Sequence, residues 1–345
     1  MMFQFTNRLG SEFRKQASVL LCLALVGSLL SACGSNSHNS LETSKQENSQ
    51  PTTAAVTPAV AEEKSIESAV ERTVKDDLGN DVTIPATVER VFAPYLEDSL
   101  LKLGVKPVAQ WSNGNMGHDY LREELKDVPK LDFSGGLPSP EVLMSYNPDL
   151  IILHTESYAK DGGYEKYSKI APTYVFSNAS GNIEKTLETL GELLGKTGEA
   201  DTALLAYQEK VNAAKDMLAA STGGKKVAII RFAAKGVSLM GGNYLCGYVL
   251  NQQLGIEMTQ LTDKENSLNV SLEVLPEIDA DYIFVINAYD QGTDRLKEMT
   301  ESAIWKTIPA VKQGHVVEMN DEYWLGSGLI AYEKIIDDTV KILTQ

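Results

Sequence analysis

The sequence predicts an α/β fold of two Rossmann-like lobes, each with a mostly parallel sheet, joined by one long rigid α-helix. Two observations favour this fold. Short apolar runs alternate with helix-like segments along most of the chain, which is the order typical of a parallel sheet covered by helices. The stretch SPEVLMSYNPDLIILH, which begins at residue 139, also returns 132 residues later as SLEVLPEIDADYIFVIN. A motif that occurs twice, within the same order of elements, indicates that one structural plan is used twice.

The two copies of this motif share their charged positions. Each places a Glu two residues after a Ser and an Asp eight residues after the Glu. These residues are Glu141 and Asp149 in the first copy and Glu273 and Asp281 in the second. The run after each Asp is apolar on both faces, which indicates a central strand that helices cover on both sides.

The first lobe is expected to cover residues 72–196. It begins with two strand-like runs around the turn Leu-Gly-Asn at 78–80, which predicts a hairpin over 73–84. The remaining elements alternate between strand and helix. The predicted strands are 91–93, 105–110, 149–153 and 173–176, and the predicted helices are 96–103, 140–146 and 164–170.

A single helix, with the second lobe after it, is predicted over residues 197–222. Its apolar residues recur at spacings of 3 and 4 along one face: Leu204, Tyr207, Val211, Ala214 and Leu218. Its central part, residues 199–220, would be about 33 Å long at 1.5 Å per residue, the width of a small domain. We therefore expect a rigid strut and not a flexible hinge.

The second lobe, residues 223–345, is expected to repeat the order of the first. The predicted strands are 227–232, 282–286 and 315–319, and the predicted helices are 244–254, 272–277, 303–308 and 330–343.

The first 32 residues are predicted to be a signal peptide. Three basic residues precede an apolar run of about 15 residues, which is too short to cross a hydrocarbon core of about 30 Å. The run ends in Leu-Ser-Ala-Cys33, which resembles the lipobox of bacterial lipoproteins, in which the Cys is lipidated. Residues 33–71 are polar and are expected to form a disordered tether. The resemblance implies an extracytoplasmic protein that is lipid-anchored to the bacterial cell membrane.

The composition excludes several kinds of protein. Removal of residues 1–32 takes 3 of the 31 basic and 1 of the 47 acidic residues, which leaves a net charge near −18. Such an acidic chain is unsuited to nucleic acids, whose binding requires cations that neutralise phosphates. Of the three Cys only Cys246 remains within the lobes, so an internal disulfide is excluded. The four His form no spaced zinc pair, and no nucleophile or phosphate-loop motif is complete. We therefore expect a binding protein without catalytic activity, cofactor or direct metal ligands.

Candidate ligand-binding residues follow the predicted strands, where α/β proteins gather ligands. In the first lobe they are Tyr95, Trp111, His154 and Tyr158. In the second lobe they are Arg231, Phe232, Asn287, Tyr289 and Trp324. Aromatic rings with a few polar groups and one fixed cation suit a bulky planar ligand or a metal chelate.

Arg231 is the most specific of these candidates. It interrupts the apolar strand VAIIRF near its end, where a permanently charged guanidinium can bind a ligand oxygen. The alternative for this residue is an ion pair with a neighbouring carboxylate at the surface. His118, in the polar loop WSNGNMGHDY, is expected to be solvated.

The chain resembles the lipid-anchored substrate-binding proteins of ABC importers for ferric siderophores, haem and cobalamin. The resemblance covers residues 73–343 and lies in the ordered segments DDLGNDVTIPATVERVFA, LLKLGVKPVA, PEVLMSYNPDLII, YSKIAP, LGELLGK, KKVAIIRF, LEVLPEIDADYIFV, IWKTIPAVKQGHVVEM and YWLGSG. It implies a ligand in a shallow cleft between two lobes that close only slightly. It also implies that one exposed Glu on each lobe engages Arg on the permease, and the matching positions are Glu141 and Glu273.

We therefore expect a monomeric solute-binding lipoprotein that captures a ferric siderophore and delivers it to an ABC permease. The first lobe has no obvious basic cluster, with Arg122 and Lys130 as the nearest candidates. This disfavours a strongly anionic tris-catecholate and leaves hydroxamate and mixed chelates open. Haem or cobalamin is the alternative ligand. The alternatives from other classes are an extracytoplasmic enzyme on a two-lobed scaffold, such as a hydrolase or chelatase, and a surface lipoprotein without a small ligand.

Overall fold

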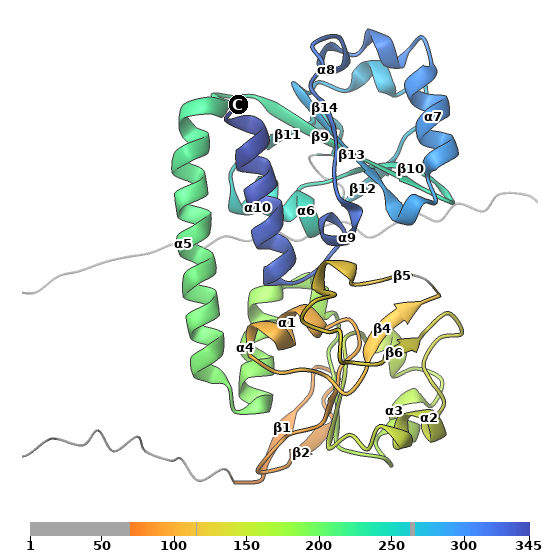
Figure 1. The fold of residues 1–345 in the computed structure, drawn as a ribbon, viewed down its shortest axis with the longest axis vertical. Coiled ribbons are helices and arrows are strands. Elements are labelled where there is room, and N and C mark those ends of the chain that lie inside the picture. Colours follow the sequence, from red (N-terminus) through yellow and green to blue (C-terminus); the bar gives the residue numbers. More distant parts are fainter. Residues whose placement is uncertain (1–69, 115, 263–265) are drawn as a thin grey trace, which may run out of the picture. The chain divides into compact units, whose positions relative to one another are not determined.

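The computed structural model describes residues 70–114, 116–262 and 266–345, which belong to one compact unit, Ser65–Gln345 (Figure 1). The predicted signal peptide, the lipidation site at Cys33 and residues 33–69 of the predicted tether lie outside the described residues. Within the described ranges, no helix combines the length and the apolar character needed to cross a bilayer.

The first lobe contains a hairpin and two small sheets. Its strands are β1 (Arg72–Lys75), β2 (Asp81–Ile84), β3 (Val91–Phe92), β4 (Gln110–Asn113), β5 (Met116–Gly117), β6 (Lys130–Asp132), β7 (Leu150–Leu153) and β8 (Thr173–Val175). Its helices are α1 (Glu97–Lys102), α2 (Pro140–Ser145), α3 (Gly163–Tyr167) and α4 (Ile183–Leu194). One sheet has the order β3-β7-β8 and is parallel, and the other has the order β5-β4-β6.

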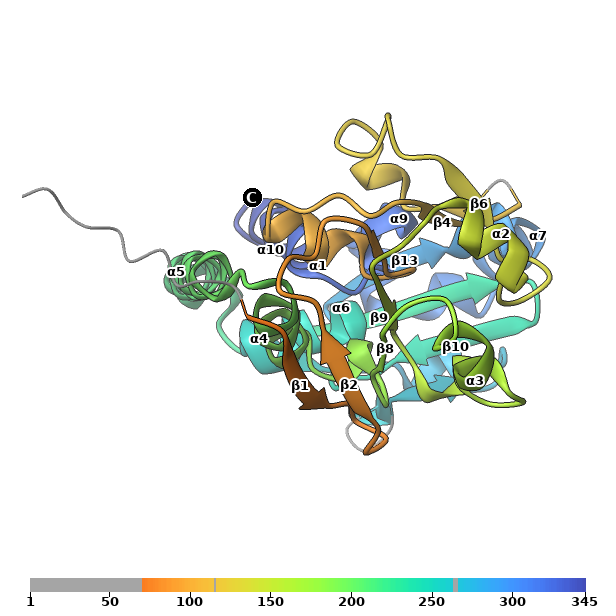
Figure 2. The same ribbon diagram turned by 90° about the horizontal axis from the view of Figure 1, so that it is seen from below.

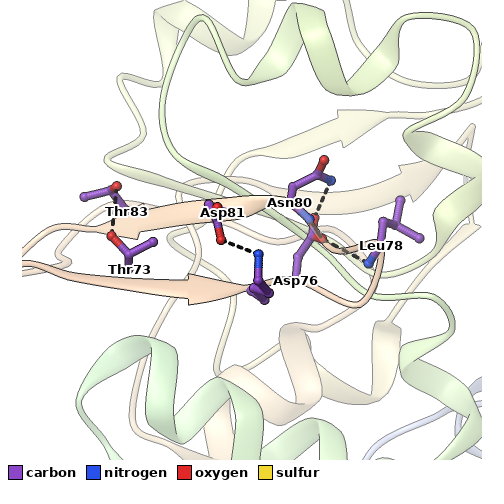
Figure 3. A network of polar contacts seen from close by, with 7 residues as sticks. Thr73, Asp76, Leu78, Asn80, Asp81 and Thr83 are labelled. Carbon is purple, nitrogen blue, oxygen red and sulfur yellow. Dashed lines mark hydrogen bonds and ion pairs between the residues drawn. The ribbon is translucent and has the colours of Figure 1, made fainter.

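Strands β1 and β2 form the hairpin that the sequence predicts over residues 73–84. The Asp76 carboxylate closes its turn by accepting hydrogen bonds from the backbone N–H of Leu78 at 3.0 Å and of Asn80 at 2.8 Å (Figure 3). It also accepts a bond from the Asn80 side chain at 2.9 Å. Gly79 has a φ of +88°, a conformation that side chains rarely adopt. Asp76 is buried, so these bonds satisfy a carboxylate that water does not reach.

Helix α5 (Thr197–Thr222) follows the first lobe, as predicted. Its buried residues are Ala200 and four members of the predicted apolar face, Tyr207, Val211, Ala214 and Leu218, and the fifth member, Leu204, is partly buried. This face packs against α4 of the first lobe and against α10 (Leu329–Leu343) of the second (Figures 1 and 2).

The second lobe is built on one six-stranded sheet. Its strands are β9 (Lys226–Ala233), β10 (Gly236–Met240), β11 (Glu257–Met258), β12 (Ser267–Asn269), β13 (Tyr282–Asn287) and β14 (Val316–Glu318). Its other helices are α6 (Leu245–Tyr248), α7 (Thr293–Glu301), α8 (Pro309–Lys312) and α9 (Asp321–Trp324). The order is β12-β10-β9-β13-β14, and β11 also pairs with β9. The central strands β9, β13 and β14 are parallel, whereas β10 and β12 add an antiparallel edge.

Several predicted elements are wrong in position or type. The strand expected at 105–110 begins only at Gln110, since Pro107 has no N–H to donate to a strand ladder. The helix expected at 272–277 is only a 3₁₀ turn, Leu275–Glu277, because Pro276 removes a helical hydrogen bond. The helix expected at 303–308 is likewise a 3₁₀ turn, Trp305–Thr307. Other elements had not been predicted: helices α4, α7, α8 and α9 and strands β5, β6, β10, β11 and β12.

The two copies of the repeated motif use their Asp in the same way. Asp149 accepts hydrogen bonds from the backbone N–H of Glu89 at 2.8 Å and of Arg90 at 3.0 Å, just before β3. Asp281 accepts one from the backbone N–H of Lys226 at 2.8 Å, at the start of β9. In each lobe the repeated Asp therefore holds the start of the neighbouring parallel strand.

The buried apolar residues form one shared core and two large outer cores. The shared core includes residues of the first lobe, of α5, of one face of the second sheet and of α10. The outer cores lie within single lobes, one around Phe92 and Tyr167 and one around Ile283 and Trp305. The two predicted lobes are therefore joined by a common core through α5 and α10.

Ile283→Ala is expected to lower the free energy of unfolding by about 2–5 kcal/mol, because Ile283 is fully buried in the centre of β13 and its loss leaves a cavity. Urea denaturation measures this change. The control is Leu205→Ala on α5, where the side chain is 63% exposed, and its effect is expected to stay within about 0.5 kcal/mol. Equal effects of the two changes would contradict the assignment of β13 to the core.

Candidate functional site

Aromatic side chains of the first lobe gather at the carboxyl ends of its strands. We call this group the ring cluster, and its members are Tyr95, Trp111, His118, His154 and Tyr158. The ring centroids of Tyr95 lie 4.4 Å from Trp111 and 4.3 Å from His154. His154 and Tyr158 are 5.0 Å apart, edge to face. All four aromatic candidates that the sequence predicted in this lobe are therefore brought together.

Three local features position the ring cluster. Tyr95 follows β3 and has a φ of +69°, a strained conformation for a large side chain and one that is enriched at ligand sites. His154 follows the last residue of β7. Tyr158 ends the 3₁₀ turn Glu156–Tyr158, at whose start the Thr155 hydroxyl accepts a hydrogen bond from Ser157 N–H. Trp111 lies within β4 and is nearly buried.

His118 is not solvated, contrary to the expectation from its polar loop. Its side chain is only 17% exposed, and its Nδ1 lies 3.2 Å from an oxygen of the fully buried Glu97. Burial alone would lower the pKa of His118, but the Glu97, Asp98 and Asp119 carboxylates outweigh burial and raise it. Glu97 also accepts a hydrogen bond from the backbone N–H of Trp111 at 2.6 Å, so one carboxylate orients two members of the ring cluster. No motif in the sequence connected Glu97 with a residue 21 positions away.

His154 is held neutral. Burial lowers its pKa from 6.5 to about 4, with Glu97 opposing and His118 adding to the fall. Its Nδ1 is buried and has no hydrogen-bond partner among the described residues, and the same holds for Trp111 Nε1. Buried polar atoms are almost always paired, so two unpaired ones in one cluster make the ring cluster a candidate site.

Arg231 lines a cavity of about 250 Å³ in the second lobe. It lies near the carboxyl end of β9, between Ser238 of β10 and Ile286 of β13. Its Nε is buried and finds no hydrogen-bond partner in the described part of the chain, which excludes the alternative of a surface ion pair through this atom. The other residues that line the cavity are Ser238, Met240, Tyr244, Leu245, Asn266, Ser267, Tyr289 and Leu325. Sequence reasoning missed Tyr244, which belongs to no predicted strand end.

Tyr289 connects the Arg231 cavity electrostatically with the ring cluster. Burial raises its pKa, Asp321 and Tyr244 raise it further, and Arg231 lowers it. Burial also raises the pKa of Tyr95 well above its usual range, with contributions from Tyr158 and Tyr289. The backbone of Tyr289 has a φ of +53°, and its N–H donates to Asp321 at 2.5 Å. Tyr289 is therefore within electrostatic reach of both Arg231 and Tyr95.

Two predicted ligand contacts need correction, and a third stays a prediction. Phe232 is fully buried in the core behind the sheet, because alternate side chains of a strand point to opposite faces and its neighbour Arg231 takes the cavity side. Trp324 is also fully buried, where it packs edge to face on Phe284 at 5.3 Å and donates from Nε1 to Asp338 at 3.0 Å. The Asn287 side chain is occupied in the turn before α7, accepting from Gly292 N–H at 3.0 Å.

A larger hollow of about 610 Å³ lies between β14 and the end of α10. None of the predicted ligand-binding residues lines it, and none of the unpaired buried polar atoms among the described residues lies in it. We therefore place the candidate site at the ring cluster and the Arg231 cavity. Within the described ranges, no three His, Cys, Asp or Glu side chains are grouped as ligands for a metal ion.

The repeated Glu residues have matching surroundings on the two lobes. Glu141 and Glu273 are both exposed. The pKa of Glu141 is lowered by a hydrogen bond from its own backbone and by Ser139. The pKa of Glu273 is lowered by Ser271 and by its own backbone. Each Ser-x-Glu turn therefore presents an ionised carboxylate to the solvent.

Residues 97–323 match the model of a family described as periplasmic binding protein. The chain is 27% identical to the probable siderophore-binding lipoprotein YfiY of Bacillus subtilis, over 76% of this chain and 85% of the relative. It is 28% identical to the iron(3+)-hydroxamate-binding protein FhuD of the same organism, over 89% and 91%. The fold is similar to that of Staphylococcus aureus SirA complexed with staphyloferrin B, with a TM-score of 0.68 and 28% identity, over 79% and 98%.

The pKa of His154 predicts how stability depends on pH. As the pH falls below 6.5 the unfolded chain protonates this His, whereas the folded chain does so only near pH 4. The free energy of unfolding is therefore expected to fall between pH 6.5 and 4, by up to about 3 kcal/mol from this group. His154→Phe keeps a ring but removes the titration, so this variant is expected to lose less stability over that range. Urea denaturation at pH 7.5 and 4.5 measures the difference, and parallel losses in variant and wild type would contradict it.

Proposed function

We propose that this chain, which belongs to the periplasmic binding protein family, captures a ferric siderophore and delivers it to an ABC permease. The ligand would lie between the ring cluster and the Arg231 cavity. We take the chain to be a binding protein and not an enzyme. Its relatives YfiY and FhuD are both named as binding proteins.

The observation that carries the proposal is the buried, unpaired Nε of Arg231 at a cavity with aromatic neighbours. A ferric chelate presents oxygen atoms, which accept hydrogen bonds, on a bulky and partly apolar body. The unpaired Arg231 Nε and Trp111 Nε1 are donors, and His154 Nδ1 can be a donor or an acceptor. These atoms and the surrounding rings therefore match the chemistry of such a ligand.

The charges at the site favour a ligand with little net negative charge. Arg231 is the one basic residue that lines its cavity among the described residues. In the ring cluster His154 is neutral at pH 7, and His118 lies next to the Glu97 carboxylate. A hydroxamate or a mixed chelate fits this balance better than a tris-catecholate, whose several negative charges would have one fixed cation as partner.

The relatives also support the cellular placement that we propose. YfiY is named a lipoprotein, and the family is that of periplasmic binding proteins. We propose that Cys33 carries the lipid and that the chain works as a monomer outside the cytoplasm, held at the membrane by residues 33–71.

Delivery requires a surface that the permease can recognise. We assign this role to Glu141 and Glu273, which are exposed, ionised and alike in their Ser-x-Glu turns. Because they lie on different lobes, a permease that binds both would respond to the spacing of the lobes. Val142 and Met144, exposed beside Glu141, add apolar surface to the same patch.

The binding proposal is tested by titrating the full-length chain with ferric trihydroxamate, ferric citrate, ferric tris-catecholate, haem and cobalamin. We expect quenching of Trp fluorescence and the tightest binding with the trihydroxamate. Arg231→Ala is expected to weaken this binding about tenfold to a hundredfold, since a hydrogen bond to a charged group contributes about 1.5–3 kcal/mol.

The matched control is Arg295→Ala, at an exposed Arg of the same lobe that donates to the Ala234 carbonyl at 3.2 Å. Its affinity is expected to equal that of the wild type. A flat response to all five compounds would refute the proposed function, and preferred binding of haem or cobalamin would replace the siderophore as the ligand.

The double variant Glu141→Ala, Glu273→Ala is expected to abolish uptake of the labelled chelate by cells while its affinity for the chelate stays unchanged. Truncation of one partner of a buried interfacial charge pair costs about 2–5 kcal/mol, so loss of two such pairs would prevent docking. The control is Glu165→Ala with Glu298→Ala, which removes one exposed Glu from each lobe elsewhere. Normal uptake in the first double variant would rule out these residues as the docking pair.

A further inference from the structure

The carboxylate of Asp98, on α1 of the first lobe, accepts three hydrogen bonds and is 1% exposed. Two come from the N-terminus of α10 in the second lobe, from the N–H of Ile330 and of Ala331, both at 2.9 Å. The third comes from the Tyr120 hydroxyl, also at 2.9 Å. Burial raises the pKa of Asp98, whereas all three donors lower it, so they oppose the cost of burying the charge.

Helix α10 depends on Asp98 for its N-terminal cap. The first N–H groups of a helix have no partner within the helix and usually bond to a side chain just before it. The residue at this position is Gly328, which has no side chain to offer. A Cβ on Gly328 would lie 2.1 Å from Cγ of Asp98, so any side chain at position 328 would displace the Asp98 carboxyl group. A carboxylate 232 residues away in the sequence thus takes the place of the local cap.

Helix α10 is connected to the Arg231 cavity through α9 and Tyr289. Helix α9 immediately precedes and packs on α10, and its first residue, Asp321, accepts the hydrogen bond from Tyr289 N–H. Tyr289 lines the Arg231 cavity and is held there with a φ of +53°. A shift of α10 would therefore move α9 and, through Asp321, the backbone of Tyr289, which lines the Arg231 cavity.

The residue next to Asp98 makes the equivalent contacts on the first lobe. Glu97 bonds to Trp111 N–H and lies beside His118, both in the ring cluster. Two adjacent carboxylates of one short helix thus hold the two sides of the candidate site, Glu97 the ring cluster and Asp98 the α9–α10 segment.

We infer that Asp98 is a positioning residue, which fixes the Arg231 cavity relative to the ring cluster by capping α10 across the lobes. The effect on ligand affinity rests on the proposed function. The cap itself does not, because it is a property of the ligand-free chain.

The test compares Asp98→Asn with Asp149→Asn in the full-length chain. Asp149 is a matched control, because it also accepts two backbone N–H bonds, from Glu89 and Arg90, but within the first lobe. Amide hydrogen exchange of the ligand-free chain, followed by NMR, is the first readout. In D98N we expect exchange at Ile330, Ala331 and Tyr289 to be at least tenfold faster than in the wild type. In D149N we expect faster exchange at Glu89 and Arg90 instead.

Affinity for the tightest-binding ferric chelate is the second readout. We expect the Kd to rise at least tenfold in D98N and less than twofold in D149N, although both variants lose stability. Gly328→Ala is a second variant that displaces the Asp98 carboxyl group without a change of charge. It is expected to give the same exchange pattern and the same loss of affinity as D98N.

Wild-type exchange at Tyr289 in both D98N and G328A would overturn the inference, as would equal losses of affinity in D98N and D149N. The exchange readout needs no ligand. If the wild type binds none of the chelates, the proposed function fails, and the exchange pattern still decides whether Asp98 positions Tyr289.

Discussion

The shared core along α5 is the constraint on which the rest of this structure depends. Tyr207, Val211 and Leu218 bury one face of the helix, which packs against α4 of one lobe and α10 of the other. A closely packed interior resists sliding of its parts, so the lobes are held in one arrangement along this core. A ligand site formed by both lobes can then be largely preformed, which reduces the ordering cost that binding has to overcome.

Buried polar groups of the described residues are mostly hydrogen-bonded, and three of the exceptions lie at the candidate site. The buried carboxylate of Asp76 is satisfied by hydrogen bonds within its hairpin, and that of Asp98 by bonds across the lobes. Arg231 Nε, Trp111 Nε1 and His154 Nδ1 are buried as well, yet they have no such partners among the described residues. The Tyr207 hydroxyl on α5 is a further unpaired buried atom among the described residues, and it lies away from the candidate site. Since an unpaired buried polar group costs free energy, the three at the candidate site are the ones that a ligand could satisfy.

In the repeated motif the Asp has a structural role, whereas the Glu is exposed at the surface. The repeated Asp ties the start of one parallel strand to the next in both lobes, through Asp149 and Asp281. The repeated Glu makes no such contact and remains exposed at Glu141 and Glu273. One plan used twice therefore produces two matching sheet ends and, at the same time, one similar carboxylate on each lobe. The local structure around the Glu differs, because Glu141 lies in the first turn of α2, whereas Pro276 limits the second copy to a 3₁₀ turn after Glu273.

The sequence by itself determined the hairpin, the central strands and the apolar face of α5, because these depend on local periodicity and turn chemistry. It also predicted Tyr95, Trp111, His154 and Tyr158 of the ring cluster, because they follow or end apolar runs. It also singled out Arg231, an obvious interruption of an apolar strand. Only the tertiary structure decided that Phe232 and Trp324 are core residues and that His118 is buried beside Glu97. The residues after a strand are readable from sequence, but which side chain faces a cavity depends on the helices packed over it. Contacts such as that of Asp98 with α10 join residues more than 230 positions apart, for which no local pattern exists.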